Sequence, residues 1–483
     1  MTVQREQGHI YVMMMLLGGV LCLFAATAQA LDLWTAWRFA QERDPIYATA
    51  QASSAADQHL IGQARAQLLP HIHASAGVDH HDRRNAKDFG NAHSSHNNLW
   101  AFTLTQPLFD RQNLRLYEHA QYLAAMAVVD EENARAELML RLSQTYFDTL
   151  NAQDTLHSLR AQLKATEKQH QAALRAFELG SATITDAQEA QSRLDLLRAQ
   201  IVTAEDTLRQ QFYALERMIG QPSQDLATLR TDAHLPAPEP DDPNQWQTQA
   251  GEHNLAVTRA DLALQAQQQY LESSKSRHDP TVQLQARTGS QHRNNAFTER
   301  RSPRSMDSSI SIELSIPIFT GGEISAKVQE ESERLRQRHF ERENARRAAV
   351  EAAQRYFSGV TSGLLEVRSL EEAKKSSQSA LEANQLAYQV GVRTLVDVLN
   401  AQQQFYETRR SLFNARYRVL LNSLQLKYAA GTLTDDDLWA INQLLETQPT
   451  EQTLEVIPTE QEQSTPTPDD ATAPITQPPI LQR

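Results

Sequence analysis

Four histidines are the residues most able to do chemistry, because they fall within one polar stretch: His80, His81, His93 and His96. Imidazole nitrogen is a common zinc ligand, and histidine changes its charge near neutral pH. Such a group could therefore bind a metal. The spacing, however, matches no fixed pattern of metal ligands. We therefore predict no metal site in this stretch.

Recognisable catalytic patterns are missing from the rest of the sequence. It has no glycine-rich phosphate loop, no local motif of a serine–histidine–aspartate triad, and no His/Cys/Asp cluster at ligand spacing. His71 and His73 alternate along a predicted strand, where they are explained as polar residues on its wet face. We predict no catalytic residue and no cofactor, and hence no enzyme.

Charge and composition exclude some partners and favour long helices. The formal net charge is −13, and Lys and Arg form no basic stripe, so we expect no nucleic acid partner. Aromatic residues make up 6% of the chain, and the mean hydropathy is −0.54. This composition is typical of long helices with narrow apolar seams.

The N-terminus has the pattern of a signal peptide over residues 1–30. Arg5 precedes an apolar run from Tyr11 to Ala26, and Ala28-Gln29-Ala30 forms a small-x-small cleavage site. The only cysteine, Cys22, follows Leu21 and not a small residue, which argues against lipidation. No later segment has the apolar length of a membrane helix, so entry into a membrane would require a β-barrel.

The elements that position the polar residues occur twice. Residues 177–186 (FELGSATITD) are matched by residues 388–397 (YQVGVRTLVD), 211 positions later (388 − 177). The segment 106–109 (QPLF) is matched in the same way by 316–319 (IPIF), 210 positions later (316 − 106). A period this long exceeds that of solenoid repeats and indicates two copies of one large half.

We divide the chain accordingly. After the signal peptide we predict a first structural repeat (31–220), a linker (221–248), a second repeat (249–438) and a C-terminal extension (439–483). Proline, threonine, glutamine and glutamate dominate the last part, which we expect to be disordered from about residue 449.

Alternation of apolar and polar residues predicts two strands in each repeat: His71–Asp79, Leu99–Thr105, Thr281–Arg287 and Ile310–Ile316. Long polar loops, His80–Asn98 and roughly Gly289–Asp307, connect them. A soluble sandwich would explain any one strand. Four strands with apolar residues outside and polar residues inside fit a membrane barrel better. Four strands cannot close a barrel, so several copies must each contribute a share.

Long helices follow each pair of strands. Neither glycine nor proline occurs between Pro107 and Gly180, and a helix of this length would reach about 100 Å. The shorter helix that follows carries an apolar seam with alternating steps of three and four residues: Leu194, Leu197, Ile201, Ala204 and Leu208. This spacing is typical of a coiled coil.

Together these features resemble the TolC-like outer-membrane channel family over roughly residues 31–438. The strongest markers are the segment 106–109, the segment 388–399 (YQVGVRTLVDVL) and the segment 430–433 (AGTL). The resemblance implies a mainly α-helical fold with a membrane β part. Three copies would form a twelve-stranded barrel in the outer membrane of a Gram-negative cell and a coiled-coil tunnel in the periplasm.

The same resemblance implies partners. A periplasmic adaptor (membrane fusion) protein and an inner-membrane pump of the ABC or RND type would dock at the tunnel tip and supply the energy. The channel itself would be passive and would export protein in type I secretion, or drugs in efflux. The alternative is a periplasmic coiled-coil adaptor or scaffold, which shares the helices and the signal peptide but needs no amphipathic strands.

The resemblance also assigns a periplasmic gate. Tyr388 and Arg393 occupy positions that tie the inner helix pair to neighbouring helices. Asp186 occupies the position of an acceptor for the tyrosine, and Gln169 that of a partner for the arginine. Hydrogen bonds of this kind are charge-assisted, and half-exposed ones are weak enough to break on docking.

A pore constriction is implied next to the gate. Asp397 aligns with a pore-facing carboxylate, and three copies would form a ring that attracts cations. A second acid of the family pattern is replaced here by Asn400, so we expect one strong ring. The matching position in the first half is Glu189 (400 − 211), which could supply the missing charge or face outward.

Overall fold

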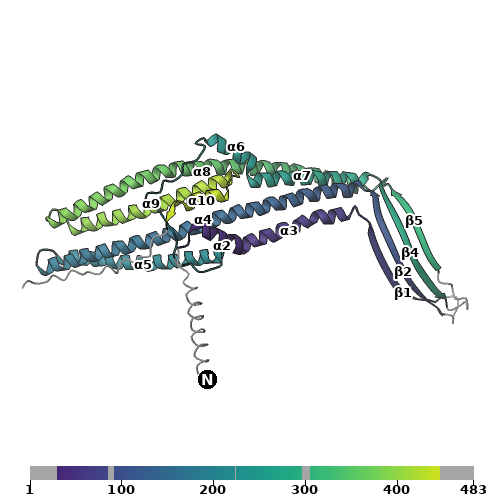
Figure 1. Ribbon diagram of the computed structural model, residues 1–483, viewed down its shortest axis with the longest axis horizontal. Coiled ribbons are helices and arrows are strands. Elements are labelled where there is room, and N and C mark those ends of the chain that lie inside the picture. Colours follow the sequence, from purple (N-terminus) through teal and green to yellow (C-terminus); the bar gives the residue numbers. More distant parts are fainter. Residues whose placement is uncertain (1–29, 85–91, 224, 296–304, 447–483) are drawn as a thin grey trace, which may run out of the picture.

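Helices form a long rod, and a curved four-stranded sheet extends from one end of it (Figure 1). The computed structural model describes residues 30–84, 92–223, 225–295 and 305–446, with side chains described outside 81–97 and 291–305. This described part is mainly helical, as predicted. None of its helices is sufficiently long and apolar to cross a membrane.

Two helices run most of the length of the rod. α4 (Arg111–Glu178) and α8 (Glu323–Gln389) have 68 and 67 residues, so each is about 100 Å long. α4 confirms the long helix predicted from the absence of glycine and proline. Asp110 starts it by accepting a hydrogen bond from the backbone N–H of Asn113 at 2.9 Å.

Shorter helices pack along these two. Away from the sheet, α5 (Ile184–Ile219) folds back on α4, and α9 (Leu395–Ala429) folds back on α8. Next to the sheet, α3 (Pro45–Ala66) packs on α4, while α7 (Leu255–Lys275) lies against both α4 and α8. Each long helix therefore packs against shorter helices both near the sheet and at the far end of the rod.

The sheet has the strand order β1-β2-β4-β5, with neighbours antiparallel. Its members are β1 (His71–Arg84), β2 (Ala92–Phe109), β4 (Thr281–Asn295) and β5 (Ser305–Ser315). One register row crosses all four strands with apolar residues: Ile72, Leu104, Ala286 and Ile310. The adjacent row is polar: His73, Thr103, Arg287 and Ser309. The predicted alternation of faces is confirmed.

The strands are longer than predicted, and the predicted loops are correspondingly too long. Strand pairing continues to Arg84 on β1 and begins at Ala92 on β2, inside the expected loop 80–98. β4 likewise extends to Asn295 and β5 begins at Ser305. The apolar alternation fades in these segments, but backbone hydrogen bonds need no apolar side chains, so pairing extends beyond the pattern.

Smaller elements surround the middle of the rod. They are α2 (Leu33–Arg43), α6 (Pro243–His253), α10 (Asp435–Asn442) and a two-stranded sheet of β3 (Thr228–Leu229) and β6 (Leu445–Glu446). The largest cluster of buried side chains lies here and includes Trp37, Leu142, Tyr146, Phe147 and Leu215. The Tyr146 hydroxyl donates to the carbonyl of Ala227 at 3.0 Å, which satisfies this buried polar group.

The segment expected to be a surface linker takes part in this core. Leu226 and Ala227 are each 3% exposed, and the Leu31 N–H donates to the carbonyl of Asp225 at 2.8 Å. The boundaries expected at 249 and 439 fall inside α6 and α10. The signal peptide and the C-terminal extension from residue 447 on lie outside the described residues.

Candidate functional site

The end of the rod away from the sheet is formed by two turns, which we call the helical tip: residues 179–183 between α4 and α5, and residues 390–394 between α8 and α9. Figure 1 shows the two turns on the same side of the molecule. Gly180 and Gly391 have positive φ angles of 72° and 76°. The Ser181 N–H donates back to the carbonyl of Ala176 at 2.8 Å, which closes a Schellman turn.

The recurring Thr-x-x-Asp motif starts the helix after each turn. The Asp186 carboxylate accepts hydrogen bonds from the N–H and hydroxyl of Thr183 at 3.2 and 2.9 Å. The Asp397 carboxylate accepts the same two bonds from Thr394 at 3.0 and 2.9 Å. These are capping boxes, and they satisfy backbone donors that a helix start leaves free. The motif therefore has a local structural reason in both halves.

Asp397 keeps its charge while it caps α9. Its second oxygen lies 3.9 Å from Nη1 of Arg393, and its side chain is 37% exposed. The hydrogen bond from the Thr394 backbone lowers the pKa of this carboxyl, and the Thr394 hydroxyl and Arg393 act in the same direction. An ionised, half-exposed carboxylate at a helical tip can interact with cations.

Tyr388 lies where all four helices of the tip meet. Its ring packs against a buried cluster from α4, α5 and α9: Ala173, Ala187, Ala190, Leu395 and Leu399. Burial raises the pKa of the Tyr388 hydroxyl, and the negative charge of Asp186 raises it further. The structure thus brings Tyr388 near Asp186 from a different helix pair.

Two expected hydrogen bonds are not formed within one chain. Among the described residues, the Tyr388 hydroxyl donates no hydrogen bond to Asp186, and Gln169 forms none with Arg393. Arg393 instead pairs with Asp397 on its own side of the turn. The gate assignment of these residues stays a prediction.

Asn400 is bound by a residue that the sequence did not single out. Arg193 on α5 donates from Nη2 to Asn400 Oδ1 at 3.2 Å and from Nη1 to Gln403 Oε1 at 2.7 Å. Its Nε donates to Glu189 Oε1 at 3.1 Å. Glu189 is therefore paired and does not present a free charge beside Asn400. Only the Glu189–Arg193 spacing of four residues is visible in the sequence.

A buried polar contact joins α9 to α4 further along the rod. Gln402 is 2% exposed, and its Nε2 donates to the Thr166 hydroxyl at 2.8 Å. Arg410, also on α9, donates to Gln162 Oε1 at 3.2 Å. The two helix pairs of the tip are thus held together partly by polar groups.

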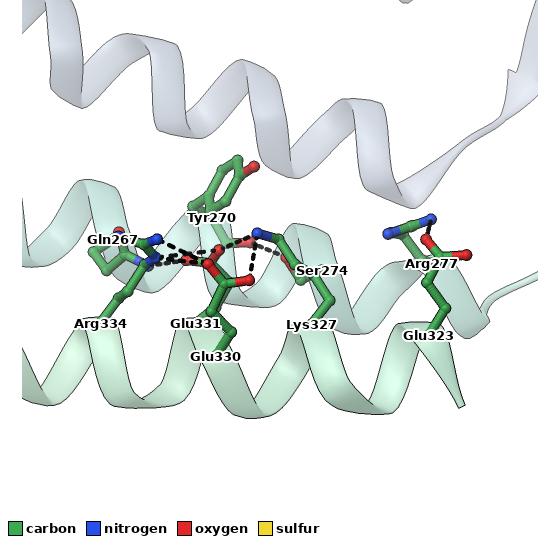
Figure 2. Close-up of polar contacts among 9 residues, drawn as sticks. All are labelled: Gln267, Tyr270, Ser274, Arg277, Glu323, Lys327, Glu330, Glu331 and Arg334. Atoms are coloured by element: carbon green, nitrogen blue, oxygen red, sulfur yellow. Dashed lines mark hydrogen bonds and ion pairs between the residues drawn. The ribbon is translucent and has the colours of Figure 1, made fainter. Parts of the chain in front are cut away.

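A second polar cluster lies near the sheet, between α7 and α8 (Figure 2). Glu331 is 1% exposed, and Gln267 and Lys327 bind its two oxygens at 2.6 and 2.8 Å. The hydrogen bond to Glu331, followed by that to Glu330, raises the pKa of Lys327. Both carboxylate oxygens of Glu331 have partners, one of them from α7, so its buried charge is not left unpaired at the contact between α7 and α8.

Comparison with known proteins places the chain in a family. Residues 38–221 and 246–432 match the family described as "Outer membrane efflux protein". The chain belongs to this family. The family and the outer-membrane location predicted from the sequence are confirmed.

Relatives of known role are similar over nearly the whole length of this outer membrane efflux protein. It is 28% identical to outer membrane protein TolC of Escherichia coli (strain K12) over 438 residues, which cover 89% of this chain and 88% of TolC. It is 29% identical to the proteases secretion protein PrtF of Dickeya chrysanthemi over 434 residues, which cover 88% of this chain and 93% of PrtF.

Solved structures share the fold. CusC, whose structures concern folding and transmembrane channel formation, superposes with a TM-score of 0.72 at 18% identity and covers 83% of this chain and 92% of its own. The outer membrane protein VceC of Vibrio cholerae superposes with a TM-score of 0.71 at 17% identity and covers 83% and 96%. The tip, the rod and the sheet thus belong to an established architecture.

Proposed function

We propose that this efflux family member is the passive exit duct of an envelope-spanning export system. Two structural repeats per chain would give four strands and two helical hairpins. Three chains would then close a twelve-stranded barrel in the outer membrane and a helical tunnel in the periplasm. The observation that carries this proposal is the sheet, which has two open edge strands and an apolar face.

The edge strands require a partner. Within the described part of the chain, β1 and β5 each pair with a single strand, so they are the edge strands of the sheet and can pair with a further strand. Among the apolar residues of the sheet, Ile72 and Ile310 are 72% and 79% exposed in one chain. Pairing of β1 with β5 of the next copy satisfies the edges, and a threefold ring of such contacts closes. Outer-membrane lipid would cover the apolar row.

The helical tip would receive the partners. We propose that a periplasmic adaptor and an ABC or RND inner-membrane pump dock there. Tyr388, Arg393, Asp186 and Gln169 would hold the tip closed, in part through contacts between copies. Asp397 would line the constriction as a ring of three carboxylates. The name of PrtF favours export of a protein, and the family description favours efflux, so the two candidate cargoes are a secreted protein and small toxic compounds.

Reconstitution tests the channel. The protein purified in detergent should have the mass of three chains, should lose this state on heating, and should form ion-conducting channels in planar bilayers. A protein that is soluble without detergent and gives no conductance would be an adaptor or scaffold instead. The presence of a four-stranded sheet with an apolar row argues for the first outcome.

A deletion strain distinguishes the two substrates. Loss of the gene should abolish appearance of a specific protein in the culture medium if the duct serves type I secretion. It should instead raise susceptibility to small toxic compounds if the duct serves drug efflux. Identification of the inner-membrane protein that co-purifies after cross-linking assigns the pump class directly.

A further inference from the structure

Among the described residues, Arg193 alone makes hydrogen bonds between α5 and α9, the shorter helices of the two hairpins of the helical tip. We propose that Arg193 is a positioning residue of the gate, which fixes α9 against α5 at the level of Asn400. The inference rests on the proposed function, because it assumes that α8 and α9 move when the tip opens.

The guanidinium of Arg193 joins the helices in a fixed geometry. It spans Asn400 and Gln403, which lie one turn apart on α9, with bonds of 3.2 and 2.7 Å. A planar fork that binds two acceptors at once sets both distance and rotation, which a lysine cannot do. Among the described residues, Arg193 makes all the hydrogen bonds between α5 and α9.

Charge balance around Arg193 explains why Asn400 is an amide. Glu189 already neutralises the guanidinium at 3.1 Å, and the Arg193 side chain is 31% exposed. Asn400 then acts as a neutral acceptor, and its link to Arg193 stays a simple hydrogen bond. An aspartate at position 400 would instead form an ion pair with Arg193 and would hold the hairpins together more strongly.

A small polar cavity lies beside the hydrogen bonds of Arg193. It has a volume of 60 Å³ and is lined by both helix pairs: Gln162, Thr166, Arg193, Gln403 and Arg410 are among its residues. A cavity of this size and polarity admits water. Water can replace the acceptors when α9 moves away, so no buried donor is left unpaired.

The two halves of the chain differ at this position. The residue that corresponds to Arg193 in the second half is Gln404 (193 + 211), which binds Thr408 on its own helix. The link therefore exists once per chain. Three copies would carry three such links, each from the hairpin of α4 and α5 to the hairpin of α8 and α9.

Single-channel recording of Arg193→Gln tests the role in gating. Loss of a charged, bidentate link should raise the open probability about tenfold, and Arg193→Lys should give a smaller rise. Arg198→Gln is the matched control, because Arg198 lies on the same helix and pairs with Asp195 and Glu167 but not with α9. Thermal stability should be similar for both glutamine variants, since each loses half-exposed ion pairs.

Asn400→Asp tests the charge argument. Alone, it should lower the open probability, because the new carboxylate pairs with Arg193, and it should strengthen divalent-cation block less than when Arg193 is also replaced by glutamine. Combined with Arg193→Gln, it should create a second blocking ring. Equal block in the single and the double variant would overturn the proposal. An unchanged open probability in Arg193→Gln would also overturn the role of Arg193 in gating, while the proposed exit duct would stand. A protein that gives no conductance at all would instead refute the exit duct.

Discussion

Asp397 combines a structural and an electrostatic role in one carboxylate. One oxygen caps α9 through Thr394, and the other lies toward Arg393. Alanine substitution would remove both roles at once, so a change in ion block could reflect a distorted helix start. Asparagine keeps an oxygen that can accept the capping bonds and removes only the charge. Separating the two roles therefore depends on the choice of substitution.

Asp397→Asn should abolish divalent-cation block in bilayer recordings, as should Asp397→Ala, because the constriction loses its only predicted ring. Asp397→Ala should in addition lower thermal stability. Asp437→Asn provides the control, since Asp437 has the same capping role on α10 and lies outside the tip. Block that persists in Asp397→Asn would place the cation site elsewhere.

The pH dependence of the block follows from the lowered pKa of Asp397. Because the folded-state pKa lies below that of the unfolded chain, the carboxylate and its contribution to stability are fully present above the ordinary carboxyl range. Both are lost only as the pH falls through the lowered pKa. Block should therefore be unchanged between neutral pH and about pH 5. A loss of block near pH 6 would indicate a histidine instead.

Tyr388 and Arg393 allow a second test at the tip. Tyr388→Phe keeps the ring packing of the apolar cluster, and Arg393→Ser removes the partner of Asp397. If these residues hold the tip closed, the double variant should raise conductance several-fold. Tyr213→Phe with Arg209→Ser makes the same chemical changes on an exposed part of α5 and should leave conductance unchanged. Unchanged conductance in both would mean that other contacts close the tip.

At the scale of elements, the hairpin of α8 and α9 depends on close contact between these two helices. Gly363 lies on α8 where a Cβ atom would come 2.7 Å from Cγ2 of Val419, so the two helices approach through a missing side chain. At Gly62 on α3, an added Cβ atom would meet no other atom within 4 Å. Both glycines sit inside helices, where alanine is intrinsically preferred. The surroundings of each glycine therefore decide whether substitution by alanine raises or lowers the stability of the protein.

Gly363→Ala should therefore destabilise the protein by about 1 kcal/mol, because overpacking exceeds the gain in helix propensity. Gly62→Ala should stabilise it by about 0.5–1 kcal/mol. Thermal unfolding in detergent, followed by circular dichroism, measures both. Equal shifts in the same direction would show that helix propensity, and not the α8–α9 contact, controls the response at position 363.

The sequence predicted helices and strands correctly where apolar residues recur with a single clear period. Apolar alternation predicted the strands, and the seam through Leu194 and Leu197 predicted α5, because each pattern reports the face that a single element buries. The contact of Arg193 with Gln403 joins residues 210 positions apart. It depends on how α5 is rotated against α9, which no local pattern encodes. The burial of Leu226 was not predicted for the same reason: its neighbours come from distant helices.

At the scale of the whole molecule, a rod of helices joins two exposed surfaces, the sheet and the helical tip. At one end the sheet exposes apolar residues and open strand edges, and at the other the helical tip exposes Leu179, Val390 and Val392 beside the charged pair of Arg393 and Asp397. Long helices such as α4 are marginal alone and need neighbours along their length. Ile201 and Leu208 remain only half-buried in one chain, although they belong to the predicted seam. A second copy alongside α5 would complete their burial.

Disulfide cross-linking can test the assembly at the sheet. A cysteine at His73 on β1, combined with cysteines tested in turn at Ser309, Ser311 and Ser315 on β5, should yield covalent trimers at one register. These strands are opposite edges of the sheet in one chain, so such a bond must join different copies.

Two cysteine pairs serve as controls for this experiment. Thr288→Cys with Ser308→Cys should cross-link within the chain, since these hydroxyls lie 2.8 Å apart. Thr103→Cys with Ser309→Cys should give neither product, because β4 separates β2 from β5. Failure of every β1–β5 pair, with the internal pair still forming, would exclude closure of a barrel through these edges.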